Sequence, residues 1–177
     1  MQKILILLTA LSAYTPAFSQ PADYPVPPQT QNRLFYIQRN LNKNTIIYDV
    51  NFDKNGNIRK DDPVDVYWIR YEEKGQRMEL RAIERRFAFG EKCIPLKSNP
   101  EYYRLKIAAT DKKELLLKQT APFKAVVYMK INGKYSKLVH LYIFADTSKF
   151  WPDVKYIEIF GKDIKTGKPT YEKMIDP

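Results

Sequence analysis

The chain has 177 residues, and its 30 Lys and Arg residues against 20 Asp and Glu give a formal net charge of +10 at pH 7. This charge favours anionic partners, but the basic residues are scattered, without the run that is typical of a basic tail. Cys93 is the only cysteine, which excludes an internal disulfide, so the hydrophobic core of one domain must supply the stability.

The N-terminal residues follow the order of a secretory signal peptide. Lys3 is positive, residues 4–13 are almost wholly apolar, and Ala17-Phe18-Ser19 places small residues at the two positions that a signal peptidase reads. The apolar run has about half the length that a membrane span requires. We therefore expect residues 1–19 to be removed on export to the periplasm or the medium, with no transmembrane anchor and no nucleic-acid partner. A buried N-terminal strand or helix is the alternative.

A proline-rich segment follows the predicted cleavage site. Residues 20–32 contain Pro21, Pro25, Pro27 and Pro28, a composition that favours an extended, polyproline-like stalk. A single β-rich domain is expected over residues 33–177.

Apolar and polar residues alternate along much of this domain, which predicts half-buried antiparallel strands. Strands are expected near 34–39, 45–52, 64–72, 102–109, 113–119, 123–131, 138–144, 154–160 and 169–174. The segments 64–72 and 138–144 are apolar on both faces and predict central strands. Asn132-Gly133 predicts a tight hairpin turn.

One segment near 77–88 breaks the alternation. Leu80, Ile83 and Phe87 fall at helical spacing, and Gly90 is placed to end a helix. The alternation of Met78 and Leu80 fits a strand instead. We predict one helix near 77–88 in a mainly β fold of eight or nine antiparallel strands, either a β-sandwich or a small β-barrel.

The sequence holds no strong catalytic signature. Cys93 and His140 would form a nucleophilic pair only if they were adjacent in space, and no local nucleophile motif surrounds Cys93. His140 shares a strand face with Leu138 and Tyr142, which is typical of a hydrogen-bonded core histidine. We therefore expect Cys93 to be dispensable for any activity and no catalytic residue to be present.

Residues 51–62 follow the spacing of a calcium loop. Oxygen-bearing side chains stand at the first, third, fifth and twelfth places, with Gly56 at the sixth. The candidate ligands are Asn51, Asp53, Asn55, Asn57 and Asp62. The arginine at the ninth place and the short last ligand depart from the pattern, so we favour a polar hairpin loop without metal. Calcium is the one cofactor that remains open.

Aromatic residues recur along the predicted strands, mostly as core residues, because aromatic side chains favour strands. Exposed ones could hold a sugar or lipid, with Arg39, Arg70 or Lys106 nearby for an anionic group. Trp151 lies in a loop pattern and is the aromatic side chain that we most expect to be exposed.

Four segments carry a family resemblance: 34–40 with Asn44, 63–69, 84–90, and 156–161 with Thr166-Gly167. They resemble the exported bacterial proteins of the domain-of-unknown-function family 4833, over residues 34–175. The resemblance implies export and a single domain, but no activity. Its polar members Arg39, Asn40, Glu84 and Glu158 are candidates either for binding or for structure, for example as a buried ion pair between Arg39 and Glu84.

We favour an exported, non-catalytic binding module whose partner is an anionic glycan, a lipid head group or an acidic protein. The candidate ligand-binding residues are Arg39, Asn40, Arg70, Glu84 and Trp151. Two alternatives remain open. A hydrolase or transferase of the envelope would need a cleft with convergent carboxylates, and a structural envelope protein would need no small ligand.

Overall fold

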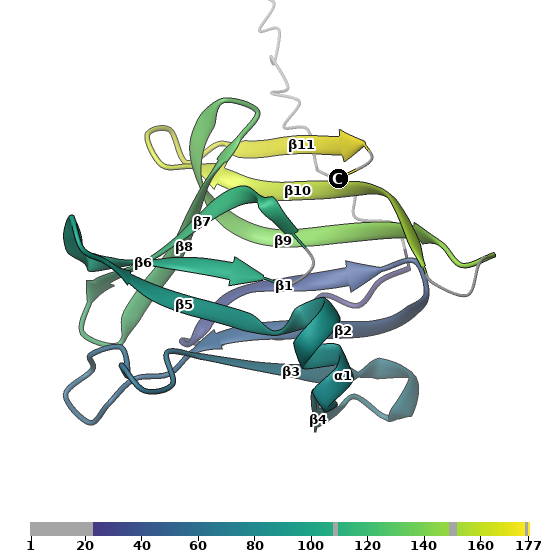
Figure 1. Ribbon diagram of the computed structural model, residues 1–177, viewed down its shortest axis with the longest axis horizontal. Coiled ribbons are helices and arrows are strands. Elements are labelled where there is room, and N and C mark those ends of the chain that lie inside the picture. The colour runs from purple at the N-terminus through teal and green to yellow at the C-terminus, as the bar shows by residue number, and fades with distance from the viewer. Residues whose placement is uncertain (1–22, 108–109, 149–151, 176) are drawn as a thin grey trace, which may run out of the picture.

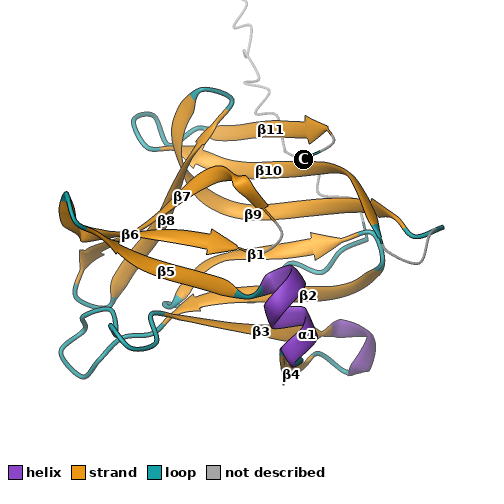
Figure 2. Cartoon of the chain, viewed as in Figure 1, coloured by secondary structure: helices purple, strands orange, loops and turns teal. Residues whose placement is uncertain are grey.

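The computed structural model describes residues 23–107, 110–148, 152–175 and 177 (Figure 1). The predicted signal peptide and Trp151 lie outside these residues. The described chain is mainly β with one short helix, which confirms the predicted fold class (Figure 2). No helix in this part of the chain is long and apolar enough to span a bilayer.

The described residues form eleven strands. They are β1 (Arg33–Arg39), β2 (Asn42–Val50), β3 (Val64–Arg70), β4 (Gln76–Glu79), β5 (Glu91–Leu96), β6 (Asn99–Ile107), β7 (Thr110–Ala121), β8 (Lys124–Ile131), β9 (Lys134–Asp146), β10 (Asp153–Asp163) and β11 (Pro169–Ile175). A 3₁₀ turn, η1 (Tyr71–Glu73), follows β3. The helix consists of α1 (Ala82–Glu84) and a wider helical turn, η2 (Arg85–Phe89).

All nine predicted strands are present, and the two that the pattern missed are short strands at the sheet edges. Every residue of β4 is exposed. In β5 the burial alternates over residues 91–94, but Ile94 is exposed and Pro95 follows, so neither strand shows an alternation of apolar and polar residue types. The helix begins at Ala82 rather than near 77, because residues 76–79 take the strand conformation that Met78 and its neighbours also allowed.

The strands form one mixed sheet in the order β4-β3-β2-β1-β9-β8-β7-β6-β5, with β10 and then β11 on the other edge of β9. All neighbours are antiparallel except β1 and β9, which pair in parallel from Tyr36 and His140 onward. The prediction of a purely antiparallel sheet is therefore wrong at this pair. A parallel pair is joined by a long crossover rather than a hairpin, and no local pattern reveals a crossover that comprises β2 to β8.

The long strand β9 divides the sheet into two wings. Residues 134–137 of β9 pair with β8, whereas residues 140–143 pair with β1 on the same edge. The first wing (β1–β4) and the second wing (β5–β8) diverge from β9, and Figure 1 shows β5 and β6 in front of β1 and β2. The wings end at β4 and β5, which do not pair with each other, so the sheet formed by the described strands is not closed.

Alternate residues of both wings point into one core, as a side-chain period of two requires. The inward side chains include Phe35, Ile37, Ile46, Tyr48, Val66 and Trp68 of the first wing, and Leu105, Leu115, Leu117, Val127 and Met129 of the second. The Tyr48 hydroxyl donates a hydrogen bond of 2.6 Å to the carbonyl oxygen of Phe89. This bond ties the end of the helix to the core.

A second row of side chains crosses the opposite face of the sheet. The row has one residue from each of six neighbouring strands, and successive members are cross-strand partners. They are Tyr67 (β3), Ile47 (β2), Tyr36 (β1), His140 (β9), Phe160 (β10) and Tyr171 (β11). The His140 ring stacks between Tyr36 and Phe160, with ring-centre distances of 4.9 and 4.1 Å. His140 is buried as predicted, but its Nε2 atom has no hydrogen-bond partner. A β-bulge beside it turns Leu138 to the core face.

The described part of the proline-rich segment packs against the domain. Residues 24–30 are irregular, as a stalk would be, but the ring of Tyr24 contacts that of Tyr142 edge-on at 5.6 Å between ring centres. The side-chain amide of Gln38 donates to the carbonyl oxygen of Pro25 at 2.9 Å, and Pro27 is buried. This segment covers part of β1 and β9, which differs from a free stalk.

Candidate functional site

Two arginines end inward-facing rows of the first wing. On β1 Arg39 follows Phe35 and Ile37, and on β3 Arg70 follows Trp68. Both strands run antiparallel to β2, which lies between them, so they run in the same direction and end at the same end of the core. The alternation therefore brings two guanidinium groups to the place where the apolar rows meet the surface.

The two guanidinium groups converge on the indole ring of Trp68. The Cζ atoms of Arg39 and Arg70 lie 4.7 and 5.7 Å from the centre of this ring. Trp68 is buried and contacts Phe89 edge-on at 5.5 Å, and Arg39 Cζ lies 5.3 Å from the Phe89 ring centre. Such cation–π contacts offset part of the cost of burying a cation. We call Arg39, Trp68, Arg70, Glu84 and Phe89 the Arg–Trp cluster.

Glu84 covers this cluster from the helix. Its carboxylate accepts hydrogen bonds from Trp68 Nε1 at 3.2 Å and from the Arg81 backbone amide at 2.9 Å, and it forms an ion pair with the Arg81 side chain at 2.8 Å. Burial alone would raise the pKa of Glu84, but the bonds from Arg81 and Trp68 hold it below its ordinary value. An Arg39–Glu84 ion pair, one of the alternatives left open by the sequence, is not formed among the described residues; the Glu84 carboxylate pairs with Arg81 and accepts from Trp68 instead.

Each arginine of the cluster keeps one buried donor without an acceptor. The Nε atoms of Arg39 and Arg70 are shielded from solvent and have no hydrogen-bond partner among the described residues. The other contacts are a long one of 3.4 Å from Arg39 to Asn42 and an ion pair of 3.1 Å from Arg70 to Glu73. Burial lowers the pKa of Arg39, which the carboxylate of Glu84 opposes and the charge of Arg70 reinforces. Buried donors without acceptors are rare in proteins, so these two Nε groups are the candidate donors of the site.

Asn40 and Glu158 have structural partners. The Asn40 side chain donates to the carbonyl oxygen of Ala145 and accepts from its amide, both at 2.9 Å, and so extends the pairing of β1 with β9. Glu158 accepts a hydrogen bond of 2.6 Å from the Tyr171 hydroxyl. The structure therefore brings Arg39, Arg70 and Glu84 together, whereas the Asn40 side chain binds the backbone of β9.

The 51–62 segment is a hairpin loop. Phe52 and Ile58 form an isolated antiparallel bridge, and Gly56 has a φ of 80°, a conformation that glycine adopts without strain. The amide of Ile58 donates to the side chain of Gln119 at 3.0 Å, and Gln119 donates to the carbonyl oxygen of Gly56 at 2.8 Å. These bonds fasten the loop to β7.

The candidate calcium ligands are engaged with one another in this loop. One carboxylate oxygen of Asp53 accepts hydrogen bonds from the amides of Asn55 and Asn57 at 2.8 and 2.9 Å, which hold the pKa of Asp53 below its ordinary value. Asn51 donates to Asp62 at 3.1 Å. In the described part of the chain, no three His, Cys, Asp or Glu side chains lie close enough together to hold a metal. The arrangement supports the hairpin interpretation, because the oxygens face donors of the protein.

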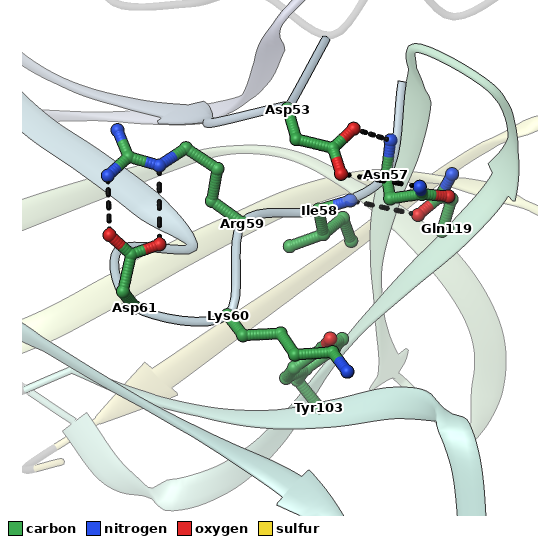
Figure 3. A pocket seen from close by; sticks show the side chains of 8 residues that line it. All are labelled: Asp53, Asn57, Ile58, Arg59, Lys60, Asp61, Tyr103 and Gln119. Atoms are coloured by element: carbon green, nitrogen blue, oxygen red, sulfur yellow. Dashed lines mark hydrogen bonds and ion pairs between the residues drawn. The ribbon is translucent and has the colours of Figure 1, made fainter. Parts of the chain in front are cut away.

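An open cleft of about 680 Å³ lies beside the loop (Figure 3). It is lined by Asp53, Asn57, Ile58, Arg59, Lys60, Asp61, Tyr103 and Gln119. Most of its polar groups bind each other: Arg59 forms an ion pair of 2.5 Å with Asp61, and Gln119 holds the loop. Figure 3 draws no bond to Lys60 or Tyr103. The cleft is therefore a weaker candidate than the Arg–Trp cluster, since none of its lining side-chain atoms is a buried donor or acceptor without a partner.

Cys93 and His140 do not form a catalytic pair. Cys93 packs against the core between the wings, whereas His140 belongs to the stacked row on the opposite face of the sheet. Burial raises the pKa of the Cys93 thiol to about 12 and lowers the pKa of His140 to about 4. The thiol is thus poorly suited to form a thiolate near neutral pH.

Sequence reasoning missed Trp68 and Phe89 as members of the site. The sequence pattern assigns both to the core. A charged residue two positions after the last inward-facing apolar residue of a strand is the feature that could have indicated the site. Arg70 stands two positions after Trp68, and Arg39 stands two positions after Ile37, so each guanidinium lies on the inward face beside the last apolar side chain.

No curated protein and no solved structure matches this chain. The model of one family, described as Domain of unknown function (DUF4833), matches residues 35–173, which include most of β1, all of β2 to β10 and most of β11. The match spans the strands and the helix that build the Arg–Trp cluster, so the chain belongs to the DUF4833 family.

Proposed function

We propose that this protein is an exported, non-catalytic binding module, periplasmic or secreted, that holds an anionic group of a glycan at the Arg–Trp cluster. The two wings act as a sandwich-like scaffold that positions Arg39 and Arg70. The observation that carries the proposal is the pair of buried Nε donors without acceptors on two neighbouring guanidinium groups. Guanidinium groups are well matched to phosphate and carboxylate oxygens.

The energetics favour a ligand role over a structural one. A buried charge without partners costs several kcal/mol of stability. Neither Arg39 nor Arg70 has a full set of hydrogen-bond partners, so a purely structural role does not account for either arginine. A methionine at position 39 would fill a similar volume without that cost. Trp68 is itself buried, so its part in this proposal is to support the two guanidinium groups by cation–π contact.

The test is a calorimetric titration with inorganic phosphate, glucose 1-phosphate and uncharged glucose. We expect the wild type to bind glucose 1-phosphate and phosphate, and Arg39→Met and Arg70→Met to lose at least about tenfold in affinity, because each loses a charge-assisted hydrogen-bond donor. The matched control is Arg104→Met, which removes an arginine of the second wing that pairs with Glu114 at 2.9 Å. Equal weakening by Arg104→Met would refute the site.

Stability separates a binding role from a structural one. In Arg39→Met the loss of cation–π contact and the removal of a poorly paired charge oppose each other, at about 1 to 2 kcal/mol each. We therefore expect the melting temperature without ligand to change little. A large drop would identify Arg39 as a structural residue.

Export is tested separately. The mature chain is expected to begin at Gln20, and mass analysis that finds residue 1 in exported material would refute export with cleavage at this site.

A further inference from the structure

The outer face of the helix exposes two large apolar side chains. Ile83 and Phe87, four positions apart and close to one helical turn, have 57 % and 65 % of their surface exposed. The inner face of the same helix carries Glu84, which covers Trp68, and Phe89, which is buried. The helix is therefore held in place by its inner face, while Ile83 and Phe87 on its outer face are more than half exposed.

Three arginines surround this apolar pair. Arg81, Arg85 and Arg86 are exposed, and the Arg86 guanidinium lies 5.1 Å from the centre of the Phe87 ring. The single acidic residue of the helix, Glu84, is turned inward, where its charge is matched by Arg81. Arg85 approaches acidic groups only at 3.7 and 3.9 Å. We call Ile83, Phe87, Arg81, Arg85 and Arg86 the helix patch, and its outer surface is positive.

The size of the apolar centre decides between a protein and a lipid partner. A stable protein interface buries on the order of 1,000 Å² or more around a core of several side chains, whereas the helix patch offers only two. An interfacial helix needs less: a few apolar side chains that enter the head-group region, with Lys or Arg at the rim to meet anionic lipid. The positive rim and the small protruding centre match the second case.

We propose that the helix patch docks this protein on a membrane surface that contains anionic phospholipid. Ile83 and Phe87 enter the boundary between head groups and acyl chains, and Arg81, Arg85 and Arg86 meet lipid phosphates. The binding is reversible and weakens with salt, because part of it is electrostatic and screened. The proposal does not depend on the Arg–Trp cluster, since none of these five side chains supplies the buried donors of Arg39 and Arg70.

The experiment is vesicle co-sedimentation of the purified chain with phosphatidylcholine vesicles, with and without phosphatidylglycerol. We expect binding only with phosphatidylglycerol. The double variant Ile83→Ser/Phe87→Ser is expected to lower the partition coefficient by at least about tenfold, and Arg86→Gln by about fivefold. All variants carry the same N-terminal residues, so any affinity of residues 1–19 for lipid cancels in the comparison.

The matched control is Ile164→Ser. Ile164 is 50 % exposed and lies between β10 and β11, beside Lys134 and Lys165. Loss of binding in Ile164→Ser, with full binding in the double variant, would overturn the proposal and assign docking to that lysine-rich end. Binding that is unchanged in the double variant, or equal on both vesicle types, would also overturn it. Circular dichroism and melting temperature verify that each variant folds.

The lipid and anion proposals can fail separately. Arg39→Met is expected to lose phosphate binding in calorimetry and to keep its partition onto phosphatidylglycerol vesicles. The Ile83→Ser/Phe87→Ser variant is expected to behave in the opposite way. If Arg39→Met alone abolished vesicle binding, the docking surface would be the Arg–Trp cluster and the helix patch would be excluded.

Discussion

We predict that His140 makes the free energy of unfolding depend on pH between about pH 4 and 6.5. It is the only histidine of the chain, is 4 % exposed, and has a pKa lowered from 6.5 to about 4 by burial between Tyr36 and Phe160. Between pH 6.5 and about 4, His140 is therefore mostly protonated in the unfolded chain and mostly neutral in the folded chain. Stability is complete above pH 6.5 and falls as the pH decreases toward 4, by about 2 to 3 kcal/mol at pH 4.5 from this residue alone.

The variant His140→Phe isolates this effect. A phenyl ring retains the stack with Tyr36 and Phe160 but cannot bind a proton, so the variant and the wild type should differ little at pH 7.5. At pH 4.5 the variant should be more stable by about 2 to 3 kcal/mol, measured by urea unfolding. The carboxylates titrate in both proteins, so their contribution cancels. A difference between the two proteins that is the same at both pH values would refute the argument that buried His140 is neutral.

Three further predictions concern other sites. Millimolar calcium should leave the melting temperature unchanged. Asp53→Ala should lower it equally with and without calcium, because the Asp53 carboxylate accepts hydrogen bonds from amides of its own loop. A calcium-dependent rise that Asp53→Ala abolishes would contradict this. At pH 8 we expect a maleimide to label native Cys93 on the order of a thousandfold more slowly than the unfolded chain, because burial raises the thiol pKa from 9.0 to about 12 and lowers the thiolate fraction. Tyr48→Phe should cost about 1 to 3 kcal/mol in urea unfolding, because it removes the buried hydrogen bond to Phe89, whereas Tyr128→Phe should cost little.

Period-two alternation predicted nine of the eleven strands because most strands have one face in the core and one outside. It failed at β4 and β5, where an edge position leaves the inward and outward faces alike in polarity. The apolar run 138–144 correctly predicted a strand that is covered on both faces, by the core and by Tyr24. The parallel pairing of β1 with β9 was beyond the pattern, because pairing partners far apart in sequence leave no turn signal.

The sequence singled out three of the five residues of the Arg–Trp cluster, but not their geometry. Arg39, Arg70 and Glu84 were expected near a ligand, and the structure brings them together around Trp68. The sequence left open whether Arg39 and Glu84 form an ion pair, because it does not show that Arg81, three positions before Glu84 on the helix, pairs with that carboxylate. The consequence is physical: with Glu84 engaged, Arg39 retains its buried donor.

The segments that carry the family resemblance differ in how far packing accounts for them. Segment 156–161 has a packing reason, because a Cβ on Gly161 would lie 2.4 Å from the Ile131 side chain. The other three segments meet in the Arg–Trp cluster, where packing alone gives no reason for arginine: an apolar residue at position 39 would complete the row of Phe35 and Ile37 without a desolvation cost. The buried, unsatisfied donors of the two guanidinium groups carry a desolvation cost at that end of the core, which the cation–π contacts with Trp68 offset in part. Such a cost is expected where a protein must hold a charge ready for an anion, and this is why the Arg–Trp cluster is the first place to test.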